Sequence, residues 1–303
     1  MIKNVFPNPI MPGADPFVLL HEGKYYMYCT VENDKQMVDL HSFETATGKQ
    51  DGYYVYQSDD LQTWENKGPC LSCQDVMGDK WFWAPEVLHR NGKFYMVYSS
   101  EEHIGMAVAD SPLGPFKQEE KKWLYAEKAI DGHIFVDDDG TAYLYYVRLH
   151  EGNQIYVAKL SEDLLEIDTL YEACLIQAQE EWETVDCLVA EGPFVLKHKG
   201  IYYLTYSANH TRCQDYAVGV AMSKSPIGPF EKSLKNPILH RNDKFCGVGH
   251  HSFTTSKDGN TLICAYHCHD SFENFKPRRF CLNTAQFVAG DNGIDELVIN
   301  GPM

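Results

Sequence analysis

The chain has 303 residues, and its 44% hydrophobic fraction is enough to bury a packed core. Lys and Arg number 26 against 43 Asp and Glu, which gives a formal net charge of −17. Because this charge repels phosphate backbones and anionic lipids, and no run of about 20 apolar residues is present, we exclude nucleic-acid and membrane partners.

The first residues, MIKNVFPNPIMPGADPF, contain no apolar stretch of the kind that a secretory signal needs. Ten cysteines are spread along the chain, often inside apolar runs such as Tyr28-Cys29 and Ile263-Cys264. This dispersion is typical of reduced, buried thiols. We therefore expect a cytoplasmic protein.

A short unit occurs five times: an apolar run, a polar turn that ends in Gly, and an alternating run that is usually rich in Tyr. Gly turns between alternating apolar runs indicate β-hairpins. The copies are, in chain order, FVLLHEGKYYMYC at 17–29, VLHRNGKFYMVYS at 87–99, IFVDDDGTAYLYY at 134–146, FVLKHKGIYYLTY at 194–206 and FTTSKDGNTLICAY at 253–266.

A further strand follows several hairpins. GMAVADSPLGPF at 105–116 and GVAMSKSPIGPF at 219–230 match at seven of twelve positions, and segments 53–64 and 155–167 are looser relatives. Three or four strands repeated five times predict an all-β fold, a five-bladed β-propeller. The alternative, a β-sandwich with hairpins that are similar by chance, does not account for the fixed offsets. We expect rim loops at 32–52 and 66–82.

Acidic residues recur at one place in this repeat. Nine positions before the turn Gly lie Asp131, Glu191 and His250, and eight positions before Gly23 lies Asp15. Since inner strands of a propeller converge on its axis, we expect these side chains to meet at one mouth of the channel. Singly, each acid is best explained as a surface or turn residue, but the shared register favours chemistry. Glycosidic bond cleavage needs one carboxylic acid and one carboxylate, and a third acid nearby raises the pKa of the first.

At these residues the chain resembles glycoside hydrolase family 43, from Asn8 to Pro302. The resemblance implies a five-bladed propeller that hydrolyses xylan- and arabinan-type linkages with inversion. It also implies that Asp15 is the general base, Asp131 the pKa modulator and orienter, and Glu191 the general acid. The motifs that carry it are GADPFV at 13–18, WAPEV at 83–87, IDGHIFVDDDG at 130–140, AEGPFV at 190–195 and GHHSF at 249–253.

The resemblance implies further site residues. His250 matches an axial histidine that helps to hold a cation, often Ca²⁺, largely through water; substrate binding and a satisfied core histidine are the alternatives. Phe17 and Trp83 suit sugar stacking as well as core packing. Of two adjacent arginines near the end of the chain, we favour Arg279 over Arg278 as the one that contacts the substrate or the modulator carboxylate.

We expect residues 1–303 to form one catalytic domain without the C-terminal β-sandwich that many β-xylosidases of the family carry. The predicted enzyme is an exo-acting glycosidase of xylan- and arabinan-derived oligosaccharides, with β-xylosidase favoured over α-L-arabinofuranosidase. The alternative hypotheses are a retaining fructan or sucrose hydrolase and a non-catalytic sugar-binding propeller. We expect no organic cofactor.

We do not predict a zinc site, although two clusters have possible ligands: Cys70 and Cys73, and Cys264, His267, Cys268 and His269. Neighbouring residues of a strand point to opposite faces, which separates the ligands of the second cluster.

Overall fold

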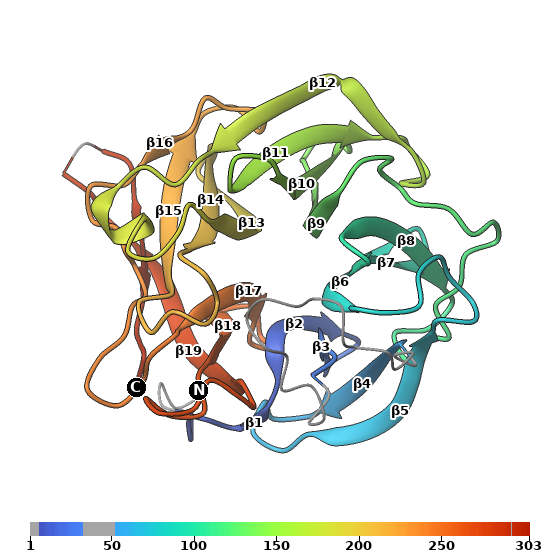
Figure 1. Ribbon diagram of the computed structural model, residues 1–303, viewed down its shortest axis with the longest axis horizontal. Helices are drawn as coiled ribbons and strands as arrows, with labels where there is room; N and C mark the ends of the chain where they lie inside the picture. The colour runs from blue at the N-terminus through green and yellow to red at the C-terminus, as the bar shows by residue number, and fades with distance from the viewer. Residues whose placement is uncertain (1–5, 33–51, 292) are drawn as a thin grey trace.

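The computed structural model describes residues 6–32, 52–291 and 293–303. Its strands form five sheets around a central axis (Figure 1), which confirms the predicted five-bladed β-propeller. The rim loop predicted at 32–52 lies, apart from its two end residues, outside the described residues. The rim loop predicted at 66–82 is in part regular structure, because β5 (Glu65–Ser72) forms the outer strand of the first blade.

All five predicted hairpins are present as the two inner strands of a blade. The first blade is β2 (Ala14–His21), β3 (Lys24–Thr30), β4 (Gly52–Ser58) and β5, and the second is β6 (Trp83–Arg90), β7 (Lys93–Ser100) and β8 (His103–Ala109). The third is β9 (Ala129–Val136), β10 (Ala142–Leu149), β11 (Asn153–Leu160) and β12 (Ile167–Ile176). The fourth is β13 (Ala190–His198), β14 (Ile201–Ala208), β15 (Ala217–Ser223) and β16 (Glu231–Lys232).

The fifth blade closes the ring with strands from both ends of the chain. It contains β17 (Gly249–Thr255), β18 (Leu262–Cys268), β19 (Arg279–Val288) and β20 (Glu296–Ile299). The short strand β1 (Met11–Pro12) pairs with β19, with Met11 opposite Phe280. One short helix, η2 (Glu181–Glu183), precedes the fourth blade, and no helix of the described residues is long and apolar enough to span a membrane.

Buried tyrosines connect neighbouring blades. The hydroxyl of Tyr28 in β3 donates to the carbonyl of Pro112, at 2.6 Å, and that of Tyr145 in β10 donates to the carbonyl of Pro226, at 2.5 Å. Both prolines belong to the duplicated SPxGPF segments, which lie in the second and fourth blades. The repeated segment therefore supplies the same inter-blade contact twice, and satisfies phenol groups that the core would otherwise leave unpaired.

Each innermost strand carries a bulge near its start, where its register with the second strand shifts. A bulge bends a strand and re-aims its side chains. One residue in each bulge has left-handed backbone geometry: Asp15 (φ 48°), Ala84 (φ 40°), Asp131 (φ 55°), Gly192 (φ 55°) and His250 (φ 43°). The five bulges place equivalent residues at one end of the axis.

The bulges correct one predicted equivalence. Asp131 and Glu191 were expected at the same blade position, with Asp15 one residue short; instead Asp15 and Asp131 are equivalent, and Glu191 lies one residue before the bulge position occupied by Gly192. The cause is hairpin length. His21 pairs with Lys24 around a two-residue turn, whereas Val136 pairs with Ala142. A count from the turn Gly therefore shifts by one residue between blades.

Candidate active site

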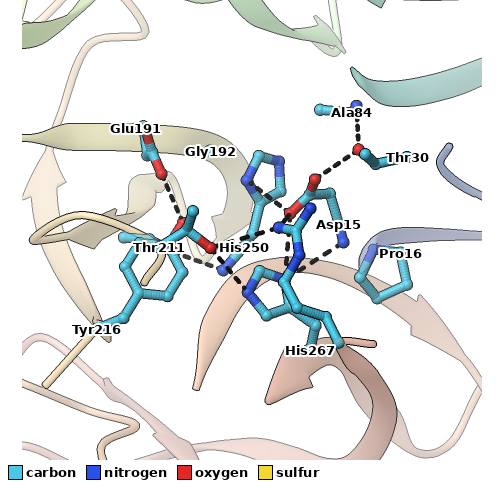
Figure 2. Close-up of polar contacts among 12 residues, drawn as sticks. Asp15, Pro16, Thr30, Ala84, Glu191, Gly192, Thr211, Tyr216, His250 and His267 are labelled. Atoms are coloured by element: carbon cyan, nitrogen blue, oxygen red, sulfur yellow. Dashed lines mark hydrogen bonds and ion pairs between the residues drawn. The ribbon is translucent and has the colours of Figure 1, made fainter. Parts of the chain in front are cut away.

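The three predicted acids lie together at one mouth of the propeller, on β2, β9 and β13. Asp15 and Asp131 are buried, and Glu191 is half-buried. Figure 2 shows Asp15 and Glu191 on opposite sides of this mouth, with a network of polar side chains around Asp15. Burial of so many carboxyl groups is unfavourable unless each has partners, so the contacts of each acid indicate its protonation state.

Asp15 is surrounded by polar and cationic side chains. Arg278 Nη1 lies 2.7 Å from Oδ1, and the Thr30 hydroxyl donates to Oδ2. His267 Nδ1 and His250 Nδ1 lie 3.1 Å and 3.4 Å from Oδ1. Burial opposes ionisation, but Arg278, then His250 and His267, outweigh it and hold the pKa of Asp15 well below its usual range. Asp15 is therefore a carboxylate at all ordinary pH values, as a general base must be.

Glu191 has the opposite electrostatic environment. Its Oε1 accepts a hydrogen bond from the Tyr216 hydroxyl at 2.9 Å, and its Oε2 accepts one from Asn153 Nδ2 at 3.0 Å. Burial raises the pKa of Glu191 to about 7, against the hydrogen bond from Tyr216 and with the help of the Asp15 charge. A carboxyl that keeps its proton near neutral pH is suited to general acid catalysis.

Asp131, in the third blade, forms hydrogen bonds with both neighbouring blades. Its Oδ2 accepts a hydrogen bond from the backbone N–H of Gly192, at 3.2 Å, and its own N–H donates to Ser99 Oγ at 2.9 Å. Burial raises the pKa of Asp131 well above its usual range, and the carboxyls of Glu191 and Asp15 raise it further. Asp131 and Glu191 therefore each keep a proton to higher pH than Asp15 does.

The bulge amides bind the blades to one another around this mouth. In four blades the amide of the bulge residue donates to a side chain at the end of the second strand of the preceding blade. The pairs are Asp15 to His267 (3.2 Å), Ala84 to Thr30 (2.8 Å), Asp131 to Ser99 (2.9 Å) and His250 to Ser207 (2.8 Å). In the fourth blade the bulge residue is Gly192, and its amide donates instead to the carboxyl group of Asp131.

Of the two adjacent arginines, Arg278 rather than Arg279 contacts one of the three acids. Arg278 is buried against Asp15, and its Nε and backbone N–H donate to Glu32 at 2.8 Å and 3.0 Å. Arg279, which the sequence favoured, instead donates from Nε to Asp270 at 2.7 Å. Neighbouring residues at the start of β19 point to opposite sides, so Arg278 and not Arg279 lies against an acid, and that acid is Asp15 rather than the modulator Asp131. Contact of Arg279 with a substrate stays a prediction.

The two predicted aromatic residues lie in different places. Trp83 precedes the bulge of its blade, as Glu191 does in the fourth blade, and its ring stacks on Trp81 with centroids 5.9 Å apart and planes 10° apart. Phe17 lines a cavity of about 460 Å³ between the innermost strands, together with Phe135 and Phe194. Phe17 is therefore beyond the acids along the axis, and sugar stacking on Trp83 stays a prediction.

His250 lies beside Asp15 as expected. Few of the side chains around it, however, could serve as ligands of a metal ion. Burial lowers the pKa of His250, so its ring is neutral and offers one lone pair. Among the described residues, no three His, Cys, Asp or Glu side chains converge as metal ligands. Ca²⁺ prefers six to eight oxygen ligands, so these side chains alone do not form a calcium site, and calcium at His250 stays a prediction.

Sequence reasoning missed the residues that hold the acids. The hydroxyl residues among them recur at a fixed position of the repeat, which could have identified them. Thr30, Ser99 and Ser207 each lie seven positions after the turn Gly of their blade. Asn153 and Tyr216 have no such signal, because they lie outside the hairpin repeat. Asn153 begins β11, and Tyr216 comes directly before β15.

Curated proteins of known activity are similar to this chain over most of its length. A β-D-galactofuranosidase from Aspergillus niger is 29% identical over 86% of this chain and 75% of its own length. A xylosidase/arabinosidase from Bacteroides ovatus is 28% identical over 73% of this chain and 78% of its own length.

Solved structures match over nearly the whole chain. An endo-1,4-β-xylanase from Bacteroides thetaiotaomicron is 39% identical with a TM-score of 0.86, covering 98% of this chain and 97% of that one. A thermostable family-43 glycoside hydrolase is 37% identical with a TM-score of 0.82, covering 98% and 96%. The sequence profile of the glycosyl hydrolases family 43 matches residues 6–290. The three acids thus lie in a glycoside hydrolase, and this chain belongs to glycosyl hydrolase family 43.

Proposed function

We propose that this protein is an inverting, exo-acting hydrolase of xylan- and arabinan-derived oligosaccharides, with β-xylosidase the favoured activity and α-L-arabinofuranosidase the alternative. One observation carries the mechanism: the environment of Asp15 lowers its pKa well below the usual range, while that of Glu191 raises its pKa to about 7. Two carboxyls with pKa values pushed apart serve as base and acid in one step.

In this mechanism Asp15 accepts a proton from a water molecule as the water oxygen attacks the anomeric carbon. Glu191 donates its proton to the glycosidic oxygen as the bond from that oxygen to the anomeric carbon breaks. The products are a free sugar with inverted configuration and a free alcohol. Transfer of a proton from Asp15 to solvent, and from solvent to Glu191, restores the enzyme.

Asp131 serves Glu191 in two ways. Its hydrogen bond from the Gly192 amide ties it to the residue next to Glu191, which orients that strand. Since Asp131 and Glu191 are coupled by charge, ionisation of one opposes ionisation of the other. This supports the role of modulator rather than nucleophile.

The substrate proposal rests on the relatives. Xylosidase, arabinosidase and endo-xylanase occur among the names of the compared proteins, and these names favour pentose-containing plant polysaccharides as the substrate class. A β-D-galactofuranosidase is also among them, and galactofuranosides therefore belong in any substrate screen.

The test is hydrolysis of three aryl glycosides: 4-nitrophenyl β-D-xyloside, α-L-arabinofuranoside and β-D-galactofuranoside, each with wild type and with Glu191→Gln. We expect the xyloside to be cleaved fastest and the variant to lose this activity. Faster cleavage of the arabinofuranoside would select the alternative, and no cleavage of any glycoside in a broader panel would reject the proposal. Product analysis with xylohexaose separates exo action, which releases xylose, from endo action.

A further inference from the structure

Tyr216 contacts the proposed general acid directly, and the proposed general base through one histidine. Its hydroxyl donates to Glu191 Oε1 at 2.9 Å. Its ring stacks on His267, with centroids 5.6 Å apart and planes 11° apart. His267 Nδ1 in turn lies 3.1 Å from Asp15 Oδ1. One aromatic stack therefore spans the mouth from one catalytic carboxyl to the partner of the other (Figure 2).

The Tyr216 ring has little freedom to move. The residue is fully buried, and its backbone N–H donates to the Cys213 carbonyl at 3.1 Å. Gly249, which opens the innermost strand of the fifth blade, leaves room for the ring, because a Cβ there would lie 2.4 Å from Tyr216 Cε1. Close packing of this kind holds a side chain in one rotamer. One carboxyl oxygen of Glu191 thus accepts a hydrogen bond from the rigidly held Tyr216, and the other accepts one from Asn153.

The chemistry of the Tyr216 hydroxyl makes it a permanent donor. Burial, with the charges of Glu191 and Asp15, raises the pKa of Tyr216 well above its usual value, so the phenol stays protonated. A hydrogen bond to a carboxylate favours the ionised form, and the bond from Tyr216 opposes the effect of burial on Glu191. Without this bond Glu191 would keep its proton to a higher pH.

We propose that Tyr216 is a positioning residue that fixes the general acid relative to the general base, its hydroxyl holding Glu191 and its ring lying on the histidine bound to Asp15. This inference rests on the roles proposed above for Glu191 and Asp15. It assigns to one buried tyrosine both the orientation of the acid and the pH at which the acid loses its proton.

The test is titration of Glu191 by NMR in protein labelled with ¹³C at the glutamate side-chain carboxyl, with the signal assigned by its loss in Glu191→Gln. Tyr216→Phe keeps the ring and the stack but removes the donor. We expect the titration midpoint of Glu191 to rise by about one pH unit. Tyr203→Phe is the matched control, because Tyr203 is an equally buried tyrosine of the same blade whose hydroxyl donates to the Asp295 carbonyl. It should leave the midpoint unchanged.

Gly249→Ala is a second variant that acts on the same contact, since its methyl group would displace the Tyr216 ring from Glu191. It should raise the midpoint in the same direction. An unchanged midpoint in both variants would overturn the proposal.

Kinetics give an independent result. If the enzyme hydrolyses xylosides, Tyr216→Phe should lower kcat about ten-fold with little change in KM, and move the basic limb of the pH profile upward. If no glycoside is hydrolysed but the midpoint still shifts, the positioning by Tyr216 stands and the proposed function fails. The two failures are thereby distinguished.

Discussion

The carboxyl group of Asp131 accepts a hydrogen bond, 3.2 Å long, from the backbone N–H of Gly192, the residue next to Glu191. In the other blades, side chains such as Thr30 and Ser99 bind the equivalent amide of the following blade. In the third blade the corresponding residue, paired with the one before the bulge, is the buried Val147. Because valine offers no acceptor, the Gly192 amide binds Asp131. The loss of one hydroxyl from the repeat thus connects the modulator to the strand of the acid.

Val147→Thr should weaken this connection, because a hydroxyl at that position would compete with Asp131 for the Gly192 amide. We expect kcat to fall by about five-fold, the equivalent of one neutral hydrogen bond. The control is Val157→Thr, at an equally buried valine of β11 in the same blade. Equal kcat values for Val147→Thr and Val157→Thr would mean that the Gly192 contact has no catalytic role.

Glu191→Gln removes the proton donor and keeps the shape of the side chain. We expect kcat on aryl glycosides with a poor leaving group to fall about 10²- to 10⁴-fold, and to fall much less with 2,4-dinitrophenyl glycosides, which need no proton to leave. Glu166→Gln, at an exposed glutamate outside the site, is the control. A loss that does not depend on the leaving group would argue against Glu191 as the acid.

Arg278→Gln tests the arginine that sequence reasoning did not choose. Asp15 acts while ionised, so activity is lost as pH falls through its pKa. Since Arg278 is the strongest group that keeps this pKa low, its removal should move the acidic limb of the kcat/KM profile to higher pH. Arg279→Gln, which breaks only the contact with Asp270, should leave the limb in place. A shift in Arg279→Gln alone would restore the original prediction.

The wild-type pH profile should be asymmetric. Activity with a neutral aryl glycoside should fall on the basic side near pH 7, where Glu191 loses its proton, because its pKa is about 7. On the acidic side it should persist below the usual aspartate range, because the pKa of Asp15 is lowered. Measurement of kcat/KM against pH reports these groups in the free enzyme. A basic limb that begins above pH 9 would exclude Glu191 as the group that titrates.

The repeat in the sequence was sufficient to predict the propeller, because hairpin turns and alternating strands are local features. It also led to the three acids, since innermost strands must converge on the axis. The predicted register was off by one residue at Glu191, because a count from the turn Gly ignores the longer hairpin between Val136 and Ala142.

Three partners of the acids were beyond prediction for a different reason. Asn153 approaches Glu191 from the start of β11, and Tyr216 approaches it from the residue before β15. Arg278 approaches Asp15 from the far end of the chain. These contacts depend on how blades pack, which no local pattern reports. The choice between Arg278 and Arg279 depended on which side of β19 faces the axis, and the sequence pattern did not distinguish them.

The stereochemistry of hydrolysis tests the central claim most directly, that Asp15 activates water while Glu191 protonates the leaving group in a single step. Proton NMR of the reaction, recorded before the free sugar mutarotates, identifies the first anomer formed from an aryl glycoside that the enzyme cleaves. The proposed mechanism predicts the anomer of inverted configuration, α-xylose from a β-xyloside. First formation of the retained anomer would contradict it, because retention requires a carboxylate that attacks carbon.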